Sequence, residues 1–443
     1  MPPAEMHPSF PRRPILRASF ARADRFVVAL TAITAIGLVA RVIATLVANQ
    51  HTDLGLGDGF FYHHSARLLA DGVGYVDPIR VPLGDGRATA LHPPLWSAIL
   101  AVPSRLGFDT ELAHRLVGCV LGAATIAVVG WCGRLLAGRR VGLVAAAITA
   151  LHPTMLAADG SLHAETVFGL CASLTLLCAM VAVRDENVRA AAAAGAMAAL
   201  AALARGEGLV LAVVMGLVLV TVFRGRLRWR MALAIVGTAL VLLAPWTARN
   251  QLMLGEPVLL STNDSTVLAG ANCDPSYFGA DIGTWHVECV RALPFTVSEV
   301  DRSAVWREDA VDYGLDHLTR TPAVATARLM RIWGLWRPGQ QEIVEGRSPG
   351  LQQVGIILHV FVVLPLAVVG AWLSRRRMPM IALVLAPIVT VALTGVLAFG
   401  TLRFRHGAEA SLAVLSAVTL VWVVDQIAEL RTKHRYAGSS PAG

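Results

Sequence analysis

The chain has 443 residues, of which 55% are hydrophobic and only 15% are charged. Soluble domains carry roughly a quarter charged residues, so this composition all but excludes a water-soluble enzyme, a disordered protein and a coiled coil. The net charge of +8 comes almost wholly from arginine, because Lys433 is the only lysine, and we do not interpret it as a nucleic-acid footprint. We expect an all-α polytopic membrane protein.

Ten apolar segments are candidates for membrane helices. An apolar helix needs about 20 residues to cross roughly 30 Å of hydrocarbon. The first segment is longer than the core of a signal peptide and lacks a clean cleavage site, so we expect it to be retained. The fifth and sixth are short enough to be one awkward pair. The candidates are residues 26–48, 112–137, 141–158, 164–183, 190–204, 208–223, 231–248, 352–373, 379–400 and 409–428.

The arginines test this topology independently. With a cytoplasmic N-terminus, every inner connection carries an arginine cluster, as the positive-inside rule requires. The even number of helices then returns the C-terminus to the cytoplasm. The clusters are Arg12, Arg13, Arg17, Arg22 and Arg25, then Arg139 and Arg140, Arg184 and Arg189, Arg224 to Arg230, Arg375 to Arg377, and Arg431 to Arg435.

These assignments divide the chain into five parts. Two long connections fall on the outer side, and both are too long to be simple hairpins. Within them we expect interfacial pieces at residues 60–70 and 94–106 and a further helix at 298–318. The parts are a cytoplasmic tail (1–25), an N-terminal membrane module (26–248) with an outer loop (49–111), an extracytoplasmic loop (249–351), C-terminal membrane helices (352–428) and a second cytoplasmic tail (429–443).

Ionisable groups beside membrane helices are costly and are therefore functional candidates. The first lie in Gly57-Asp58-Gly59-Phe60-Phe61-Tyr62-His63-His64, directly after the first predicted helix. Asp58 is suited both to capping the following helix and to acting as a catalytic base, and these roles are compatible. The adjacent histidines are expected at the interface, because they lack the spacing that places two metal ligands on one helix face.

Two further candidates follow along the outer side. His92-Pro93-Pro94 fixes an imidazole near the membrane surface, where it is either part of a turn or a donor to a lipid phosphate. Asp159 and Glu165 lie around the link before the 164–183 helix. Asp159 is a candidate helix cap, whereas Glu165 enters an apolar segment and needs a partner.

The partner that we expect for Glu165 is Arg205, which shares a short charged link with Glu207. Such a pair is either purely structural or part of a site. A last cluster, Arg403, Arg405 and His406, precedes the final helix on the face where the positive-inside rule disfavours arginine. This position indicates an anionic ligand or a pair with Glu409.

One arrangement accounts for these groups: an outward-facing cavity at headgroup depth that holds a carboxylate base and several cations. Transfer of a sugar from a polyprenyl phosphate requires this chemistry. A carboxylate deprotonates the acceptor hydroxyl as it attacks the anomeric carbon, and cations stabilise the departing phosphate.

The order and sidedness of these motifs resemble the membrane-embedded glycosyltransferases of the GT-C type, in particular the protein mannosyltransferase and aminoarabinose transferase branch, glycosyltransferase family 39. The likeness runs over residues 26–424. The matching elements are Asp58 with Tyr62, the His-Pro-Pro-Leu segment at His92, Gly160-Ser161 with Glu165, Arg205, and Arg403 with Arg405.

The resemblance implies a GT-C-like bundle in a bacterial, specifically actinobacterial, plasma membrane. It also implies a polyprenyl-phosphate sugar donor, inversion at the anomeric carbon, an envelope acceptor (protein, lipid or glycan) and Asp58 as the base. The remaining candidates would bind substrate: Tyr62, His63, His92, Asp159, Glu165, Arg205, Glu207, Arg403, Arg405 and His406. Gly59 stands where relatives commonly carry a second acidic residue, so the sequence leaves a divalent cation open.

Cys273 and Cys289 share one polar loop on the predicted outer side, where oxidising conditions favour a disulfide. The alternative function is a polytopic transporter or lipid flippase, and a third is a catalytically inactive scaffold. A transporter should show charges near mid-helix or broken helices in matching halves, which we do not find in the sequence.

Overall fold

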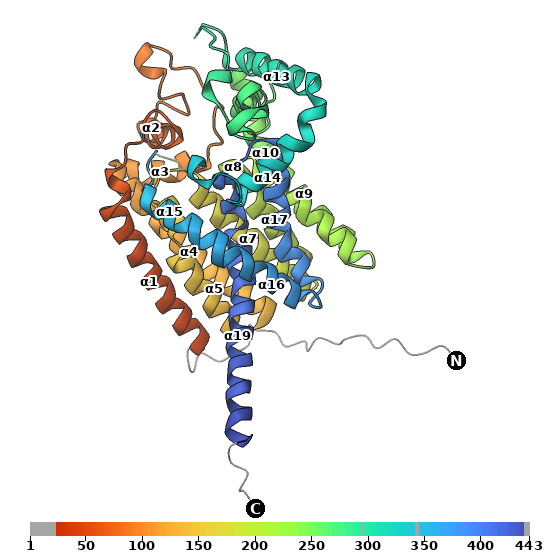
Figure 1. The fold of residues 1–443 in the computed structure, drawn as a ribbon. Helices are drawn as coiled ribbons and strands as arrows, with labels where there is room; N and C mark the ends of the chain where they lie inside the picture. Colours follow the sequence, from red (N-terminus) through yellow and green to blue (C-terminus); the bar gives the residue numbers. More distant parts are fainter. Residues whose placement is uncertain (1–23, 295, 342–344, 438–443) are drawn as a thin grey trace, which may run out of the picture.

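The computed structural model describes residues 24–294, 296–341 and 345–437, and in this part of the chain the regular secondary structure is helical apart from one isolated bridge between Val76 and Ala88. Most of the predicted N-terminal tail, including Arg12, Arg13, Arg17 and Arg22, lies outside the described residues. The membrane bundle is made of α1 (Arg25–Val47), α4 (Glu111–Ala137), α5 (Arg139–Leu151), α6 (Pro153–Asp159), α7 (Glu165–Arg184), α8 (Val188–Ala204), α9 (Glu207–Val222), α10 (Leu227–Leu254), α15 (Pro349–Leu358), α16 (Leu364–Ser374), α17 (Met380–Leu397) and α19 (Glu409–Ala437) (Figure 1).

All ten predicted segments are helical, but fewer than ten satisfy the length requirement for crossing a membrane. Among the described residues, seven helices are long and apolar enough, with α15 and α16 joined by a π-helical turn, η7 (His359–Val363), into one of them. A bent pair, α5 and α6, would make eight; the helix axis bends by 59° between the two parts. The remaining two predicted segments, α8 and α9, have 17 and 16 residues.

The two short helices pack inside the bundle because α8 is rich in small residues. Its buried face consists largely of alanines that contact α7 and α10. At Gly195 the backbone of α10 comes so close that an added Cβ would collide with the carbonyl of Ile235. Small residues let membrane helices approach closely and gain packing contacts.

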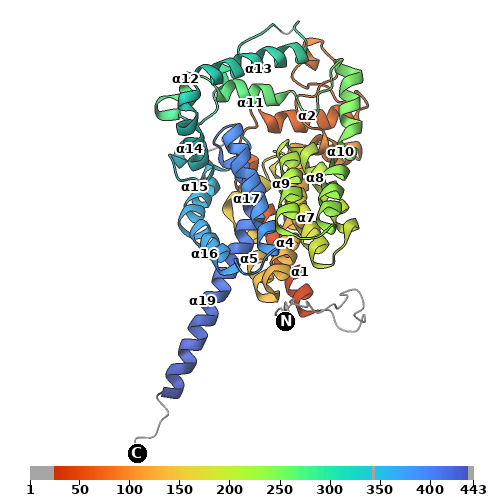
Figure 2. The same ribbon diagram turned by 90° about the vertical axis from the view of Figure 1, so that its right-hand side faces the viewer.

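The outer segments gather at one end of the bundle, and α1 begins and α19 ends at the opposite end (Figure 2). The expected interfacial pieces are α2 (Asp58–Ala70) and α3 (Leu95–Arg105), and the expected outer helix is α13 (Glu299–Asp316). The other outer elements are α11 (Asn263–Ala271), α12 (Asp274–Tyr277), α14 (Thr321–Ile332) and α18 (Leu402–Arg405).

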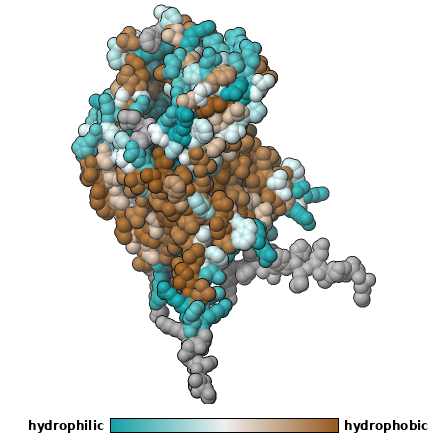
Figure 3. Space-filling view, in the orientation of Figure 1, coloured by the Kyte–Doolittle hydropathy of each residue, from teal (hydrophilic) through white to brown (hydrophobic). Residues whose placement is uncertain are grey.

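Hydrogen bonds hold the two outer segments together. The carboxylate of Glu299, the first residue of α13, accepts from the Thr89 hydroxyl at 2.6 Å, the Ala90 N–H at 2.9 Å and the Thr262 hydroxyl at 2.7 Å. Figure 3 shows a broad hydrophobic band across the visible face of the bundle, below this largely hydrophilic outer layer. The protein is therefore a multi-pass membrane protein, with the outer layer resting on one end of its apolar body.

Candidate active site

Arg403 in α18 joins two carboxylates that come from distant parts of the sequence. Its Nη2 donates to Asp58 Oδ2, and its Nε donates to Glu165 Oε1, each at 2.5 Å. Arg205 Nη1 also donates to Glu165 Oε1 at 2.8 Å, and Arg205 Nε donates to Glu207 Oε1 at 2.9 Å. The structure thus contains the Glu165–Arg205 pair expected from the sequence and brings Asp58 and Arg403 to it.

Local helix geometry positions both acids. Asp58 and Glu165 are the first residues of α2 and α7, where the helix dipole favours negative charge. The N-cap of α2 is Gly57, so Asp58 is not the capping residue itself and its carboxylate is available to Arg403. Glu165 is fully buried and is tolerated there because arginines surround it.

Arg347 is a third arginine at this site that the sequence analysis did not select. It lies just before α15 and is 4% exposed, with Nη2 3.1 Å from Glu165 Oε2. The two atoms are close but not aligned for a hydrogen bond, and Arg347 Nε and Nη2 have no hydrogen-bond partner among the described residues. This guanidinium therefore has donors to offer to a further ligand. An ionisable residue directly before a membrane helix was the signal that could have found it.

Glu345 is a second carboxylate beside Asp58 that the sequence did not reveal. It lies so close to Gly57 that a Cβ there would collide with its carboxylate, and its Oε2 is 4.0 Å from His163 Nε2. Burial, together with the charge of Asp58, raises the pKa of Glu345 above its usual value. Glu345 therefore brings a second carboxylate close to Asp58 from a distant part of the sequence.

The environment of Asp58 keeps it ionised. Burial alone would raise the pKa of its carboxyl, but the charge of the Arg403 guanidinium and its hydrogen bond hold that pKa well below its usual range. His92 Nε2 is 3.7 Å from Asp58 Oδ1. Burial lowers the pKa of His92 despite the attraction of Asp58, so its imidazole is neutral near pH 7.

Tyr62 lies beside this cluster, in contact with His92. Its buried ring is 5.2 Å from the ring of His92, and the ring of Phe61 packs edge-on against the same imidazole at 4.7 Å. The aromatic pair holds His92 facing Asp58. Six of the predicted substrate-binding residues therefore lie in or beside the cluster: Tyr62, His92, Glu165, Arg205, Glu207 and Arg403.

His63 and Asp159 lie outside this cluster, each with its own partner. His63 Nδ1 is 3.0 Å from His114 Nδ1. Asp159 ends α6 instead of capping the next helix, and it pairs with Arg41 at 2.6 Å. Arg41 also donates to three backbone carbonyls, so this buried pair ties α1 to α5 and α6. The sequence-based statement that mid-helix charges are lacking is therefore wrong, because Arg41 lies within α1.

Arg405 pairs with a carboxylate other than those of Arg403, and His406 packs against α7. Arg405 Nε donates to Glu409 Oε1 at 2.7 Å, which is the alternative pairing that the sequence left open. His406 is 6% exposed, and its ring lies so close to Gly169 in α7 that an added Cβ would press on it.

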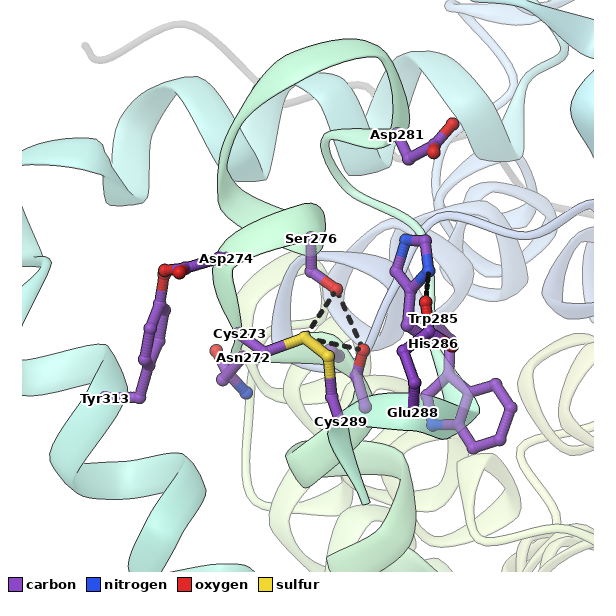
Figure 4. Close-up of a disulfide and its surroundings, with 12 residues drawn as sticks. Asn272, Cys273, Asp274, Ser276, Asp281, Trp285, His286, Glu288, Cys289 and Tyr313 are labelled. Carbon is purple, nitrogen blue, oxygen red and sulfur yellow. Dashed lines mark hydrogen bonds and ion pairs between the residues drawn. A yellow bond between two sulfur atoms is a disulfide. The ribbon is translucent and has the colours of Figure 1, made fainter. Parts of the chain in front are cut away.

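In the outer layer the structure joins Cys273 and Cys289 in a disulfide, which pins η4 (Val287–Cys289) to the start of α12 (Figure 4). The side chain of Ser276 points at the bridge and donates to the carbonyl of Gly270 at 2.8 Å. On the other side of α12, the Tyr313 hydroxyl donates to Asp274 Oδ1 at 2.7 Å. These contacts organise the surface formed by α11, α12 and α13.

Part of the sequence is similar to a known protein family. Residues 91–248 match the family described as dolichyl-phosphate-mannose-protein mannosyltransferase. The matched region contains His92, Asp159, Glu165, Arg205 and Glu207. No curated protein matches the chain.

Solved structures match nearly the whole chain. An oligosaccharyltransferase from Archaeoglobus fulgidus, solved with an inhibitory peptide and a dolichol-phosphate, is 14% identical with a TM-score of 0.56; the match covers 94% of this chain and 52% of that one. Its apo form gives 13% identity, a TM-score of 0.57, and coverages of 96% and 53%. The fold is GT-C-like. The chain spans about half the length of these archaeal enzymes.

A structure of ArnT from Cupriavidus metallidurans bound to undecaprenyl phosphate is also similar, at 15% identity and a TM-score of 0.47, covering 88% of this chain and 77% of that one. The predicted GT-C-like helical bundle is thus confirmed at the level of the fold by the archaeal matches.

Proposed function

We propose that this protein is an inverting glycosyltransferase that moves a sugar from a polyprenyl-phosphate donor to an envelope acceptor on the extracytoplasmic side of a bacterial plasma membrane. The observation that carries the proposal is the bridge that Arg403 forms between Asp58 and Glu165. The matched family description names a dolichyl-phosphate sugar donor, and the similar archaeal enzyme was solved with dolichol-phosphate, which supports this class of donor.

The arginines would bind the donor phosphate. Arg347 has guanidinium N–H donors without hydrogen-bond partners among the described residues. Arg347 and Arg403 both form ion pairs with the carboxylate of Glu165. A fork of N–H donors matches the oxygens of a phosphate, and a charge-assisted contact of this kind is strong. Glu165, Arg205 and Glu207 would then keep the two phosphate-binding arginines in place.

Asp58 would act as the base only after the donor has bound. In the resting site its pKa is too low for an efficient base, since general bases work best with a pKa near the operating pH. Donor phosphate would compete for Arg403, and the loss of that partner would raise the pKa of Asp58. Binding of the donor would thereby switch on the base.

The chemical step would then proceed in one displacement. Asp58 accepts the proton of the acceptor hydroxyl while the hydroxyl oxygen attacks the anomeric carbon. The bond between that carbon and the phosphate oxygen breaks, and the phosphate leaves with the bonding electron pair, stabilised by Arg347 and Arg403. Attack from the face opposite the leaving group inverts the anomeric configuration.

The topology proposed for this reaction has both termini in the cytoplasm. It rests on the arginine distribution and on the start of α1 and the end of α19, which lie at the end of the bundle opposite the outer layer (Figure 1). The surface around α11 to α13 would select the acceptor, whether protein, lipid or glycan. The apolar polyprenyl chain would lie against the hydrophobic band of the bundle.

The alternative of a transporter or flippase draws support from the buried charge in α1 and from the broken pair α5 and α6. The contacts argue against it. Arg41 is held by Asp159 and by three carbonyls at 3.1 Å, so each of its three guanidinium nitrogens already has a partner and it serves to join helices. A transported ion or substrate would need some of these groups to be free.

The deciding experiment compares Asp58→Asn with the wild type, using purified protein in liposomes and a labelled polyprenyl-phosphate sugar. We expect the turnover rate to fall by about 10²- to 10⁴-fold, the usual contribution of a general base. Glu345→Gln is the matched control, because it removes the neighbouring carboxylate in the same way. Wild-type turnover in Asp58→Asn, or a larger loss in Glu345→Gln, would remove Asp58 from the role of base.

A further inference from the structure

A second group of titratable side chains lies inside the bundle, separate from Arg403 and its carboxylates. It consists of His152, His359 and Glu409, all buried, whose nearest ligand atoms lie within 4.8 Å of one another. Each comes from a different element: the break between α5 and α6, the π-helical turn η7, and the first residue of α19. The function proposed above uses none of them.

The histidines have an unusual environment for buried polar groups. His152 is 3% exposed and His359 is fully buried, yet neither ring nitrogen of either residue has a hydrogen-bond partner among the described residues. Buried polar atoms nearly always have partners, because losing water without gaining a partner is destabilising. Each imidazole can offer one of these nitrogens beside the Glu409 carboxylate, and this points to a ligand that binds the three side chains together.

The backbone supports the same conclusion. His359 begins a π-helical turn within a membrane helix, and such turns are rare and frequently occur at functional sites. His152 begins the bend between α5 and α6 and is followed by Pro153, which starts α6. Two irregular backbone positions therefore present their imidazoles to the same carboxylate.

We propose that His152, His359 and Glu409 bind a divalent cation of the zinc class. Two imidazoles and one carboxylate form a known three-residue zinc donor set, which leaves a fourth position for water. Glu409 Oε1 accepts from Arg405 Nε at 2.7 Å, and this is the kind of outer contact that orients a metal-binding carboxylate.

Arg405 would complete the site through its remaining donors. Its Nη1 and Nη2 are buried and lack partners within the described part of the chain. They would donate to the water or hydroxide in the fourth position, which would keep the guanidinium away from the ion itself. The site would fix α6, η7 and the start of α19 relative to one another. Glu409, where α19 starts, is six residues after Arg403. The competing occupant is a cluster of ordered water molecules.

Metal content of the purified full-length protein, freed of any affinity tag, tests the proposal without reference to activity. After equilibration with zinc and removal of excess, we expect about one ion per chain, and EDTA should lower the melting temperature reversibly. Cobalt loading should give the visible absorption of a four-coordinate site. Wild-type protein that takes up no metal, with a melting temperature indifferent to zinc and EDTA, would overturn the proposal and leave water as the occupant.

Substitutions locate the ion. We expect His359→Gln and His152→Gln to lose stoichiometric zinc, whereas His114→Gln should keep it. His114 is also a buried imidazole, but it pairs with His63 and Ser104 outside the group. Full zinc binding by both His359→Gln and His152→Gln would contradict the proposed ligands. Where a variant does not fold, the wild-type zinc and cobalt measurements still decide.

Discussion

At the scale of single residues, the central feature is that Arg403 is shared. Each of its carboxylate partners uses a different nitrogen, so Asp58 and Glu165 are held together without touching. A ligand that attracts this guanidinium changes the environment of both acids at once. This coupling explains how a carboxyl with a strongly lowered pKa is compatible with acid–base chemistry in the proposed reaction.

Two guanidinium nitrogens of Arg347 have no hydrogen-bond partner among the described residues, and this leads to a specific prediction. A hydrogen bond to a charged group contributes about 1.5–3 kcal/mol, so Arg347→Gln should lower kcat/KM for the donor by about 10- to 100-fold. Arg105→Gln, which removes an exposed arginine from α3, should have no effect. Steady-state kinetics with varied donor concentration measures both. Equal kcat/KM in Arg347→Gln and wild type would exclude a phosphate contact.

The sequence revealed part of this site because sidedness and polarity mark it. Asp58, Glu165, Arg205 and Arg403 are ionisable groups at the outer ends of apolar segments, where such groups are costly unless they have a use. Arg347 was missed although it stands directly before a membrane helix. The sequence did not reveal Glu345, because the place of this residue depends on the path of a long outer segment with no periodic pattern. Nor did it separate Arg403 from Arg405, since a four-residue helix turns them to different partners.

At the scale of elements, hydropathy located every membrane helix but misjudged some lengths. The break at His152 and the 16-residue α9 are set by tertiary packing, which a hydropathy average does not record. The outer helices α2 and α13 were predictable because each begins with a strong start signal. Ser298 caps α13 through its hydroxyl, and Gly57 with Asp58 opens α2.

The disulfide gives the element-scale prediction. Cys273 and Cys289 are separated by 16 residues, and closing a loop of that size stabilises a fold by about 3 kcal/mol in the chain-entropy model. Replacing both cysteines with serine should lower the melting temperature of the outer layer and expose the 273–289 segment to proteases. Alkylation of the non-reduced, unfolded wild type should leave both residues unmodified. Free thiols at these two positions would contradict the pairing.

At the scale of the whole molecule, the arrangement of the two ends implies a testable topology. In intact cells a membrane-impermeant maleimide should label Glu308→Cys, which lies on the exposed face of α13. Lys433→Cys, near the end of α19, should react only after permeabilisation. The unsubstituted chain is the control: Cys119, Cys132 and Cys171 are buried, and its labelling measures any background from the half-buried Cys178. Labelling of Lys433→Cys in intact cells would place the C-terminus outside and reverse the proposed orientation.

The ion-paired groups around Glu165 form a balanced set: the cations of Arg205, Arg347 and Arg403 equal in number the carboxylates of Asp58, Glu165 and Glu207. In the proposed reaction the arriving phosphodiester adds one negative charge, and its cleavage adds another as one carboxylate takes up a proton. The total therefore stays constant throughout the displacement, and no charge accumulates in surroundings that solvate it poorly. Resetting the site then requires a proton to escape to the aqueous phase, which makes the approach of outside water to Asp58 a determinant of turnover.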